Sequence, residues 1–427
     1  MFHTVSRRHL LAGAGLSALS VPLLSACGSR SGSGSGDAAP LSFMVLGGNQ
    51  ELNAYLEDTV LPAFKEETGL DVEIQSSDWG SAFQKVTTAA ASGQIADVLL
   101  LGAIWTAPLA AKGVLLPLDG YMSTLETKDA IYPDMLADGV WDATQYSIPI
   151  GADVRTTVYR SDVLEKVGAD PTRLPTTWAE LREVAAKVRD AGVCESAIWF
   201  GLDKSIGLQQ AFAVLMLSNG ATYWKEDGTA NFDSPEAKEA LQFLVDCFDT
   251  GLSDYHLVMG ANAQRPVVAG QSAICFGGSM ADITDARNNA PDVVDKLVIG
   301  TPLTGPSASR PAGGAWINKL AVAKASKNPE GAFRFIRFLT EAPHMSQWDH
   351  LTGTLPVRED LGQEEWLGKE GKEFMELAKH VRSQEPHPGM MSFGQEINEL
   401  LQSAVRGSAT VDETAKAIND KLNAFQG

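Results

Sequence analysis

Residues 41–50 read LSFMVLGGNQ, and this stretch decides the fold class of the chain. The apolar run 41–46 has the length of a buried strand, and Gly47-Gly48 behind it predicts a turn. Apolar side chains then recur at helical spacing as far as Phe64, and Gly69 predicts the end of that helix. We therefore expect a strand that leads directly into a helix.

The same alternation of strand and helix continues along the chain. Residues 70–74 alternate between apolar and polar side chains as in a strand, residues 81–92 show a helical pattern, and the segment 97–101, apolar after Asp97, predicts a third strand. Right-handed crossovers make this order a parallel sheet with helices on both faces, whose ligands bind at the carboxyl ends of the strands. Those ends are predicted at residues 47–51, 76–80 and 102–106.

Further strands and helices alternate through the rest of the chain, so the expected fold class is α/β. Helix starts are indicated by the capping-box spacing of Thr177 and Glu180, and by a proline after Ser234 and after Asn328. Extended segments are expected at residues 146–151, 156–159, 272–276, 297–300 and 320–322. A chain of 427 residues is longer than one core usually holds, so we expect two domains.

The first 40 residues carry signals for export and for lipid attachment. Ser6-Arg7-Arg8 precedes a short apolar run and small residues before Cys27, which is the order of a secretory signal peptide. The paired arginines resemble the twin-arginine export signal, and Leu24-Ser25-Ala26-Cys27 resembles a bacterial lipobox. We expect residues 1–26 to be removed, Cys27 to carry a lipid, and residues 27–40 to form a flexible tether. An uncleaved N-terminal membrane anchor is the alternative.

The composition indicates a globular body and excludes two kinds of partner. Hydrophobic residues make up 44% and charged residues 20%, and 53 acidic against 34 basic residues give a net charge of −19. Such a body is repelled by the phosphates of nucleic acids and by anionic lipid surfaces, so we expect neither as a ligand. The other cysteines are too few for a disulfide framework. Cys194 and Cys247 could pair, whereas Cys275 lies in an apolar run and is expected to be buried.

Seven segments of the chain occur in the order found in one family of transport proteins. They are LPAFKEETGLDV (61–72), ASGQIADV (91–98), YSIP (146–149), GQSAI (270–274), GGAW (313–316), AFRFIRFL (332–339) and GTLPVR (353–358). Together, behind a lipobox, they resemble the extracellular solute-binding proteins of ATP-binding-cassette (ABC) sugar importers, the group related to maltose-binding protein. The resemblance covers nearly the whole mature chain.

The resemblance implies a two-lobed fold of the periplasmic-binding-protein type II kind, with a ligand cleft between the lobes. It assigns residues 41–151 plus 277–341 to lobe I and residues 152–276 plus 342–427 to lobe II. A ligand that contacts both lobes would stabilise the closed form, which the membrane subunits of the importer recognise. The expected protein is a monomer that captures a mono- or oligosaccharide outside the cell and is held at the outer face of the membrane by lipid on Cys27.

Tryptophan side chains are the candidates for stacking on sugar rings, because their flat faces match the apolar faces of the ligand. The resemblance places Trp316, beside two glycines, at a crossover between the lobes; a core tryptophan is the alternative. Trp79 and Trp105 lie at predicted strand ends, where open α/β sheets bind ligands. Trp199 lies in a part of lobe II that contributes cleft contacts in relatives.

Polar contacts are expected from the first strand end and from the first crossover. Asn49, Gln50 and Glu51 follow the first strand, where relatives present polar side chains to the sugar. Asp153 matches a cleft carboxylate of the family and could accept hydrogen bonds from two sugar hydroxyls. Arg155 lies beside it, and a hinge salt bridge between the two is the alternative.

Backbone and apolar contacts complete the predicted ligand site. Gly278 and Gly314 would let the backbone approach the ligand, and Ser279 would add a hydroxyl. Met391 is a candidate for the apolar wall. Maltodextrin-binding relatives have aromatic residues where this chain has Met390-Met391-Ser392, so the resemblance does not predict maltose itself.

Two other functions are weighed against sugar capture. For an exported glycoside hydrolase, the sequence offers no His-Glu-x-x-His spacing and no Gly-x-Ser-x-Gly in its folded region, so we expect no catalytic residue, metal or cofactor. A binding protein for a polyamine or another small cation is the second alternative, because aromatic boxes also hold ammonium groups. The sequence does not separate this reading from a sugar-binding one.

Overall fold

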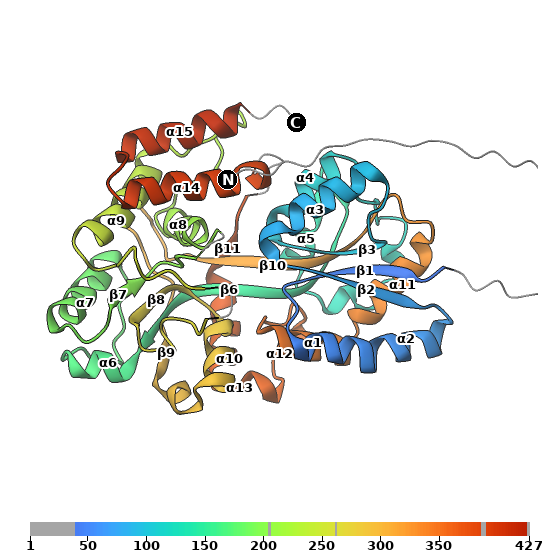
Figure 1. The fold of residues 1–427 in the computed structure, drawn as a ribbon, viewed down its shortest axis with the longest axis horizontal. Helices are drawn as coiled ribbons and strands as arrows, with labels where there is room; N and C mark the ends of the chain where they lie inside the picture. Colours follow the sequence, from blue (N-terminus) through green and yellow to red (C-terminus); the bar gives the residue numbers. More distant parts are fainter. Residues whose placement is uncertain (1–38, 204–205, 261–262, 386–389, 425–427) are drawn as a thin grey trace, which may run out of the picture. The chain divides into compact units, whose positions relative to one another are not determined.

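Figure 1 shows the computed structural model, which describes residues 39–203, 206–260, 263–385 and 390–424, without the side chains of residues 379, 382 and 390–393. The predicted signal peptide, Cys27 and nearly all of the predicted tether lie outside these ranges. Among the described helices, none combines the length and the apolar character needed to span a membrane.

Three parallel strands form one end of the main sheet. β1 (Leu41–Leu46) pairs in parallel with β2 (Val72–Ser77) and with β3 (Val98–Leu101). Between them run α1 (Gln50–Tyr55), the π-helical turn η1 (Leu56–Val60), α2 (Leu61–Thr68) and α3 (Trp79–Ser92). Gly69 and Gly93 end α2 and α3 in the left-handed conformation that glycine adopts without strain. The predicted order of strands and helices is confirmed here.

Two long strands occupy the middle of the sheet. Its strand order is β2-β1-β3-β10-β6-β8-β7, in which β10 (Gly313–Val322) and β6 (Ile148–Arg160) are antiparallel. β8 (Ser272–Gly278) and β7 (Ser196–Trp199) follow, while β9 (Leu297–Ile299) pairs with β6 and β11 (Val381–Ser383) pairs with β10. The sequence predicted two extended segments where β6 is one strand, and it predicted only residues 320–322 of β10. The pairing of these strands is irregular at Thr156/Thr157 and at Asn318/Lys319.

The first hydrophobic core surrounds β1, β3 and the end of β10. Ring centroids of Phe43 and Phe335 are 5.3 Å apart and those of Phe64 and Phe335 are 5.0 Å apart, both edge-on, so α11 (Pro329–Leu339) packs against β1 and α2. In Figure 1, α1 and α2 lie on one side of these strands and α3 and α4 (Thr106–Ala111) on the other. The expected sheet with helices on both faces is therefore present.

The second hydrophobic core lies around β7 and β8. It includes α7 (Trp178–Ala191), α8 (Gly207–Ser218) and α9 (Pro235–Asp249), and α14 (Met390–Val405) and α15 (Val411–Asn423) cover it. Thr177 forms the predicted capping box with Glu180, and Ser234 caps α9 as predicted. α8 is apolar on nearly all sides because it is buried on nearly all sides.

A third cluster packs behind β6 and β8. α10 (Met280–Asn289) and α13 (Gly368–Leu377) bring Ile283 and Phe374 into one cluster with Val158. Residues 280–299 thus pack with β6 and β8, although the resemblance placed residues 277–341 in lobe I. Where the two lobes divide stays a prediction, and this packing favours counting residues 280–299 with lobe II.

Shorter elements complete the fold. They are β4 (Val140–Trp141), β5 (Thr144–Gln145), α5 (Pro133–Ala137), α6 (Ser161–Lys166) and α12 (Ala342–Thr352). Cys194, Cys247 and Cys275 are all free, so the suggested pairing of Cys194 with Cys247 is absent from this structure. Cys275 is buried, as predicted.

A candidate ligand-binding site

Two tryptophans from different strand ends meet at the carboxyl end of the parallel strands. The ring centroids of Trp79 and Trp105 are 6.0 Å apart and the rings are nearly perpendicular. Trp79 is 40% exposed, whereas Trp105 is 5% exposed and packs in the first core. Trp105 therefore supports Trp79 edge-on, and Trp79 presents apolar surface to solvent.

Glycines make room for Trp79. A Cβ atom added to Gly47 would come 2.2 Å from Trp79 Nε1, and one added to Gly102 would come 3.3 Å from Trp79 Cζ3. Gly47 also has φ +59°, in the left-handed region that favours glycine. The turn after β1 and the turn after β3 are thus shaped around this indole ring.

The cap of α3 positions Trp79 at the first residue of that helix. Asp78 Oδ1 accepts the backbone N–H of Ser81 at 2.9 Å, and the Ser81 hydroxyl also donates to Asp78. These hydrogen bonds lower the pKa of Asp78 to about 2. The sequence predicted a helix from residue 81; it begins two residues earlier because Asp78 is the N-cap.

The polar residues after β1 have structural partners or face solvent. Asn49 caps α1, since its Oδ1 accepts the Leu52 N–H at 2.7 Å, and its Nδ2 donates to the Leu351 carbonyl at 2.8 Å. Gln50 and Glu51 are exposed in the first turn of α1. The contacts of all three residues with a ligand stay predictions.

A buried lysine holds the segment that carries Trp105. Lys319 in β10 has no exposed surface; its Nζ donates to the Ala103 carbonyl at 2.5 Å and pairs with the carboxylate of Asp138. Ala103 and Trp105 bound the 3-10 turn η2, and Ala103 and Ile104 also pack against the second core. The turn therefore joins the first core to the second.

Asp153 and Arg155, the pair predicted at the first crossover, form a salt bridge. Arg155 donates to Asp153 Oδ2 through Nε at 2.9 Å and through Nη2 at 2.6 Å, and its Nη1 donates to Gln210 Oε1 at 2.7 Å. The Arg155 guanidinium lies over the ring of Trp316, which is 8% exposed. The salt bridge given as the alternative is thus present, and Arg155 covers one face of Trp316. A hinge at this position and stacking of Trp316 on a sugar stay predictions.

A small pocket lies beside this cluster. Its volume is about 80 Å³, and its walls come from β6, β7, β8, α8 and the segment around residue 265. The lining residues are Arg155, Trp199, Gly201, Asp203, Gly207, Gln210, Ala211, Met259, Arg265, Phe276 and Gly277. Trp199 is 4% exposed, and its Nε1 has no hydrogen-bond partner among the described residues. We call this the Arg265 pocket.

Arg265 is held by a buried carboxylate. Its Nε donates to Asp282 Oδ1 at 2.5 Å, and Asp282 has no exposed surface. Burial alone would lower the pKa of Arg265, but the neighbouring Asp282 carboxylate outweighs it and the pKa is raised. Arg265 therefore stays charged at every pH at which the protein is folded.

Three of the remaining predicted residues have structural roles in this structure. Ser279 is 2% exposed and caps α10 in a capping box with Asp282. A Cβ on Gly278 would meet Val158, and a Cβ on Gly314 would meet the Trp316 ring. Met391 lies in α14, but its side chain is outside the described part of the structure. Contacts of these residues with a ligand stay predictions.

Two polar residues that line the Arg265 pocket, Gln210 and Arg265, were not predicted from the sequence. Gln210 had one visible signal, since it is a polar residue in the apolar stretch GLQQAFAVLMLS of α8. Arg265 follows no periodic pattern, so only its contact with Asp282 identifies it. Among the described residues there is no group of three or more His, Cys, Asp or Glu side chains that could hold a metal ion.

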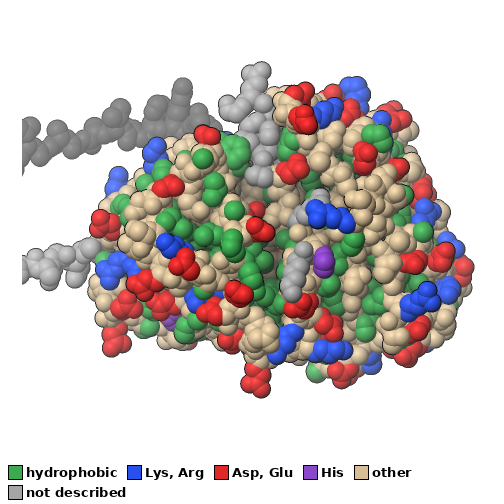
Figure 2. All heavy atoms as spheres, turned by 180° about the vertical axis from the view of Figure 1, so that it is seen from behind, with side chains coloured by type: hydrophobic (Ala, Val, Ile, Leu, Met, Phe, Trp, Pro, Cys, Tyr) green, Lys and Arg blue, Asp and Glu red, His purple; other side chains and the backbone are tan. Residues whose placement is uncertain are grey.

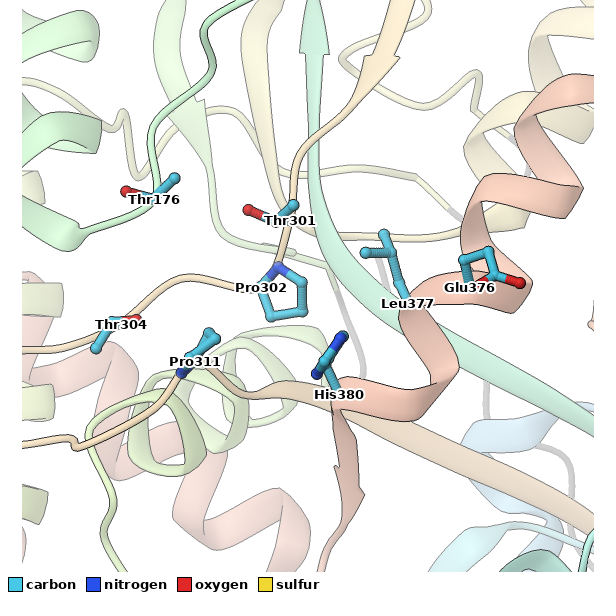
Figure 3. A pocket seen from close by; sticks show the side chains of 8 residues that line it. All are labelled: Thr176, Thr301, Pro302, Thr304, Pro311, Glu376, Leu377 and His380. Atoms are coloured by element: carbon cyan, nitrogen blue, oxygen red, sulfur yellow. The ribbon is translucent and has the colours of Figure 1, made fainter.

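A larger pocket lies elsewhere and contains none of the predicted residues. It has a volume of about 430 Å³. Figure 3 shows its lining, Thr176, Thr301, Pro302, Thr304, Pro311, Glu376, Leu377 and His380. Its hydroxyl groups come from the loops before α7 and β10, and Leu377 and His380 come from the end of α13 and the turn after it.

Comparison with known proteins identifies the family. Residues 47–345, more than half of the chain, match the family described as bacterial extracellular solute-binding protein. The chain belongs to this family. A Brucella abortus (strain 2308) protein described as a binding protein is 25% identical over 396 residues, which cover 92% of this solute-binding protein and 94% of the relative.

Solved structures of other solute-binding proteins share the fold. An ABC transporter solute-binding protein of Thermotoga lettingae bound with α-D-tagatose superimposes with a TM-score of 0.78 at 21% identity, covering 90% of this chain and 99% of that one. Maltose-bound MalE3 of T. maritima gives a TM-score of 0.77 at 24% identity, covering 90% and 98%. The predicted two-lobed α/β fold is confirmed, and the family is an extracellular one.

Proposed function

We propose that this solute-binding protein captures a carbohydrate in a cleft between its lobes and delivers it to an ABC importer. The observation that carries the proposal is the exposed indole of Trp79, supported edge-on by Trp105 at the carboxyl ends of β1 to β3. An exposed, rigidly held aromatic face is what a sugar ring needs for stacking. The tagatose-bound and maltose-bound structures of the same fold agree with this reading.

The Arg265 pocket supplies the polar side of the proposed site. Arg155, Gln210 and Arg265 offer hydrogen-bond groups that neighbouring residues already hold in place. Preorganised polar groups of this kind fix the orientation of a ligand at little entropic cost. A ligand that contacts both this pocket and Trp79 would favour one arrangement of the lobes, which is the signal that an importer needs.

The cation-binding alternative has less support. A polyamine would have to approach two guanidinium groups, Arg155 and Arg265, and Trp105, which is 5% exposed, adds no second open ring face beside Trp79. A glycoside hydrolase would need a pair of carboxyl groups on either side of the sugar. In the Arg265 pocket Asp203 is the single acidic residue of the lining.

A ligand screen tests the proposal. The melting temperature of the full chain in detergent is measured with mono- and oligosaccharides, polyols, polyamines and divalent metals. A ligand that binds only the folded form raises the melting temperature with its concentration. We expect a rise with one class of sugar, and Trp79→Ala should reduce it. A rise with polyamines alone would overturn the proposal.

Export and lipid attachment are part of the same proposal. We propose that residues 1–26 direct export, that lipid on Cys27 holds the monomeric protein at the outer face of the cell membrane, and that residues 27–40 tether it there. Cys27→Ser should release the protein from the membrane fraction of producing cells. Mass spectrometry of the wild-type N-terminal peptide should find a diacylglyceryl group on Cys27, and an unmodified cysteine would contradict the anchor.

A further inference from the structure

We infer that the Arg265 pocket receives an oxyanionic group, a carboxylate or a phosphate, so that the captured ligand is an acidic sugar. The inference rests on the proposed function and narrows its substrate class. It comes from hydrogen-bond donors that converge on one small pocket and have no partner among the described residues. Two side chains, Arg265 and Trp199, carry it.

The Arg265 guanidinium has a free edge. Its Nε is bonded to Asp282 Oδ1, and its terminal nitrogens Nη1 and Nη2 have no hydrogen-bond partner among the described residues. The planar pair of N–H groups on that edge matches the two oxygens of a carboxylate or phosphate. Asp282, itself bonded to the Ser279 N–H at 2.8 Å, fixes the other edge, so the free edge is preorganised.

Trp199 adds an unsatisfied buried donor to the same pocket. The residue is 4% exposed, and its indole N–H finds no acceptor among the described residues. A buried N–H group without a partner costs free energy, so such groups are rare unless a ligand or water accepts from them. An indole N–H can only donate, which again selects a ligand group rich in acceptors.

The charged side chains around the pocket present N–H groups to a ligand. Two of its lining residues are arginines and one is an acid, Asp203. Asp203 is engaged, because its Oδ1 accepts the N–H of Gly207 at 3.1 Å at the first turn of α8. Asp153 and Asp282 balance the charges of Arg155 and Arg265, so the pocket offers an anion N–H donors and no net positive charge. The protein as a whole has a net charge of −19, and its acidic side chains are spread widely over the face drawn in Figure 2. Binding of an anion here depends on short-range hydrogen bonds and not on long-range attraction.

The size of the pocket fits one end of a ligand. Its volume of about 80 Å³ is well below the roughly 300–1,000 Å³ of pockets that enclose a whole small molecule. A carboxylate or phosphate group fills such a space, while the sugar ring that bears it stays outside. The ring is then free to contact other residues of the proposed site.

Calorimetric titration of the full chain in detergent tests the inference. The probes are glucose, maltose, glucuronate, galacturonate, glucose 6-phosphate, glycerol 3-phosphate and inorganic phosphate. Two conservative variants each remove one feature. Trp199→Phe deletes the N–H but keeps the ring, and since that N–H has no partner among the described residues, the fold loses no hydrogen bond seen there. Arg265→Lys keeps a cation beside Asp282 but removes the planar edge.

A second tryptophan, outside the pocket, provides the matched control. Trp366→Phe also removes an indole N–H, which bonds Ser346 Oγ at 3.0 Å and does not line the pocket. We expect an acidic sugar to bind at least about tenfold more tightly than its neutral parent. Trp199→Phe and Arg265→Lys should each weaken that binding about tenfold, and Trp366→Phe should leave it unchanged. Uronates and sugar phosphates separate the two possible sources of the oxyanion.

The outcomes distinguish this inference from the proposed function. If a neutral sugar binds as tightly as its acidic counterpart and neither variant changes its affinity, the inference is wrong while sugar capture stands. If inorganic phosphate binds but no sugar, neutral or acidic, does, both the sugar-binding function and the acidic sugar are wrong. Selective loss of acidic-sugar affinity in the two variants supports both the sugar-binding function and the acidic-sugar inference.

Discussion

The guanidinium carbon of Arg155 lies 4.7 Å from the centroid of the Trp316 ring. Asp153 and Gln210 hold the guanidinium there, and the side chains of Asp153 and Arg155 are 22% and 21% exposed. A sugar could stack on that face of Trp316 only after Arg155 had moved. In this arrangement Trp316 belongs to the wall of the second core, and Trp79 is the aromatic face open to a ligand.

The Asp153–Arg155 pair should couple energetically. Arg155→Met leaves the Asp153 carboxylate partly buried without its partner, so we expect a loss of about 1–3 kcal/mol in the free energy of unfolding. Asp153→Asn combined with Arg155→Met should recover part of that loss. Urea denaturation of both single variants and the double variant measures the coupling. A coupling near zero would mean that solvent screens this pair as it screens surface pairs.

Trp79 should contribute mainly to sugar binding, and Trp105 mainly to the stability of the fold. Trp105→Ala empties a site in the first core and should cost about 3–5 kcal/mol of stability. Trp79→Ala removes an exposed ring and should change stability far less, but it should weaken sugar binding about tenfold or more. Tyr255→Ala, which removes a 42% exposed aromatic ring elsewhere, is the control for exposure. Equal sugar affinity in Trp79→Ala and Tyr255→Ala would exclude the stacking role.

Gly47 should affect ligand binding because it leaves space for Trp79, and not only because of its backbone conformation. Gly47→Ala and Gly69→Ala both put a side chain on a residue with positive φ, +59° and +73°, and each should cost about 1 kcal/mol of stability. At Gly69 the added Cβ meets nothing within 4 Å, whereas at Gly47 it would come 2.2 Å from the Trp79 indole. Only Gly47→Ala should therefore displace Trp79 and weaken sugar binding. Fluorescence of Trp79 and ligand titration check this; the same affinity in both variants would contradict it.

Lys319 should be one of the most sensitive positions in the chain. Lys319→Met leaves Asp138 without its cation and Ala103 without its donor, and we expect a loss of about 3–5 kcal/mol in the free energy of unfolding. Lys416→Met, which breaks the exposed pair with Asp420, should cost less than about 0.5 kcal/mol. Chemical denaturation compares the two variants. Similar small losses would show that Lys319 does not anchor the η2 turn.

Asp349 should make the stability depend on pH. Burial raises the pKa of this carboxyl well above its ordinary value, and its Oδ2 has no partner among the described residues. The folded state then holds a proton that the unfolded chain has released, so the contribution of Asp349 to stability is largest below about pH 4 and falls as pH rises towards the raised pKa. Asp349→Asn removes this contribution, so the stability of the variant relative to the wild type should rise as pH increases above about 4.

Asp360 provides a control, because its contribution to stability should change with pH in the opposite direction. A hydrogen bond from Arg358 lowers the pKa of Asp360, so its contribution is present above about pH 4 and is lost as pH falls through the lowered pKa. Asp360→Asn should therefore lose stability relative to the wild type as pH rises. Urea denaturation at several pH values checks both variants. Parallel curves for Asp349→Asn and the wild type would exclude a proton on Asp349.

Local patterns were enough to predict the parallel strands and the place of two site residues. Apolar runs and left-handed glycines mark β1, β2, β3 and their helices, because those signals depend on neighbours in sequence. The carboxyl ends of parallel strands must lie at one edge of a sheet, so Trp79 and Trp105 could be placed together in advance. Capping signals worked for the same reason at Thr177 and Ser234.

Residues whose roles depend on distant partners could not be predicted in this way. Nothing near Arg265 in sequence indicates its partner Asp282 or the pocket that it shares with Trp199. Arg155 covers Trp316 because β6 and β10 pair, which brings together residues far apart in the chain. Ser279 was predicted to contact the ligand, although a serine three residues before an acid at a helix start also indicates the cap that it forms.

The pairing of β3 with β10 has a consequence for synthesis. Lys319 in β10 comes 216 residues after Ala103, the residue it holds beside β3. At roughly 5–20 residues per second, the ribosome needs on the order of 10–40 s to make that stretch. During this time the apolar edge of β3 has no partner strand, and an unpaired strand edge in a nascent chain promotes aggregation. A chaperone that binds this edge until β10 has been synthesised would protect the nascent chain from aggregation.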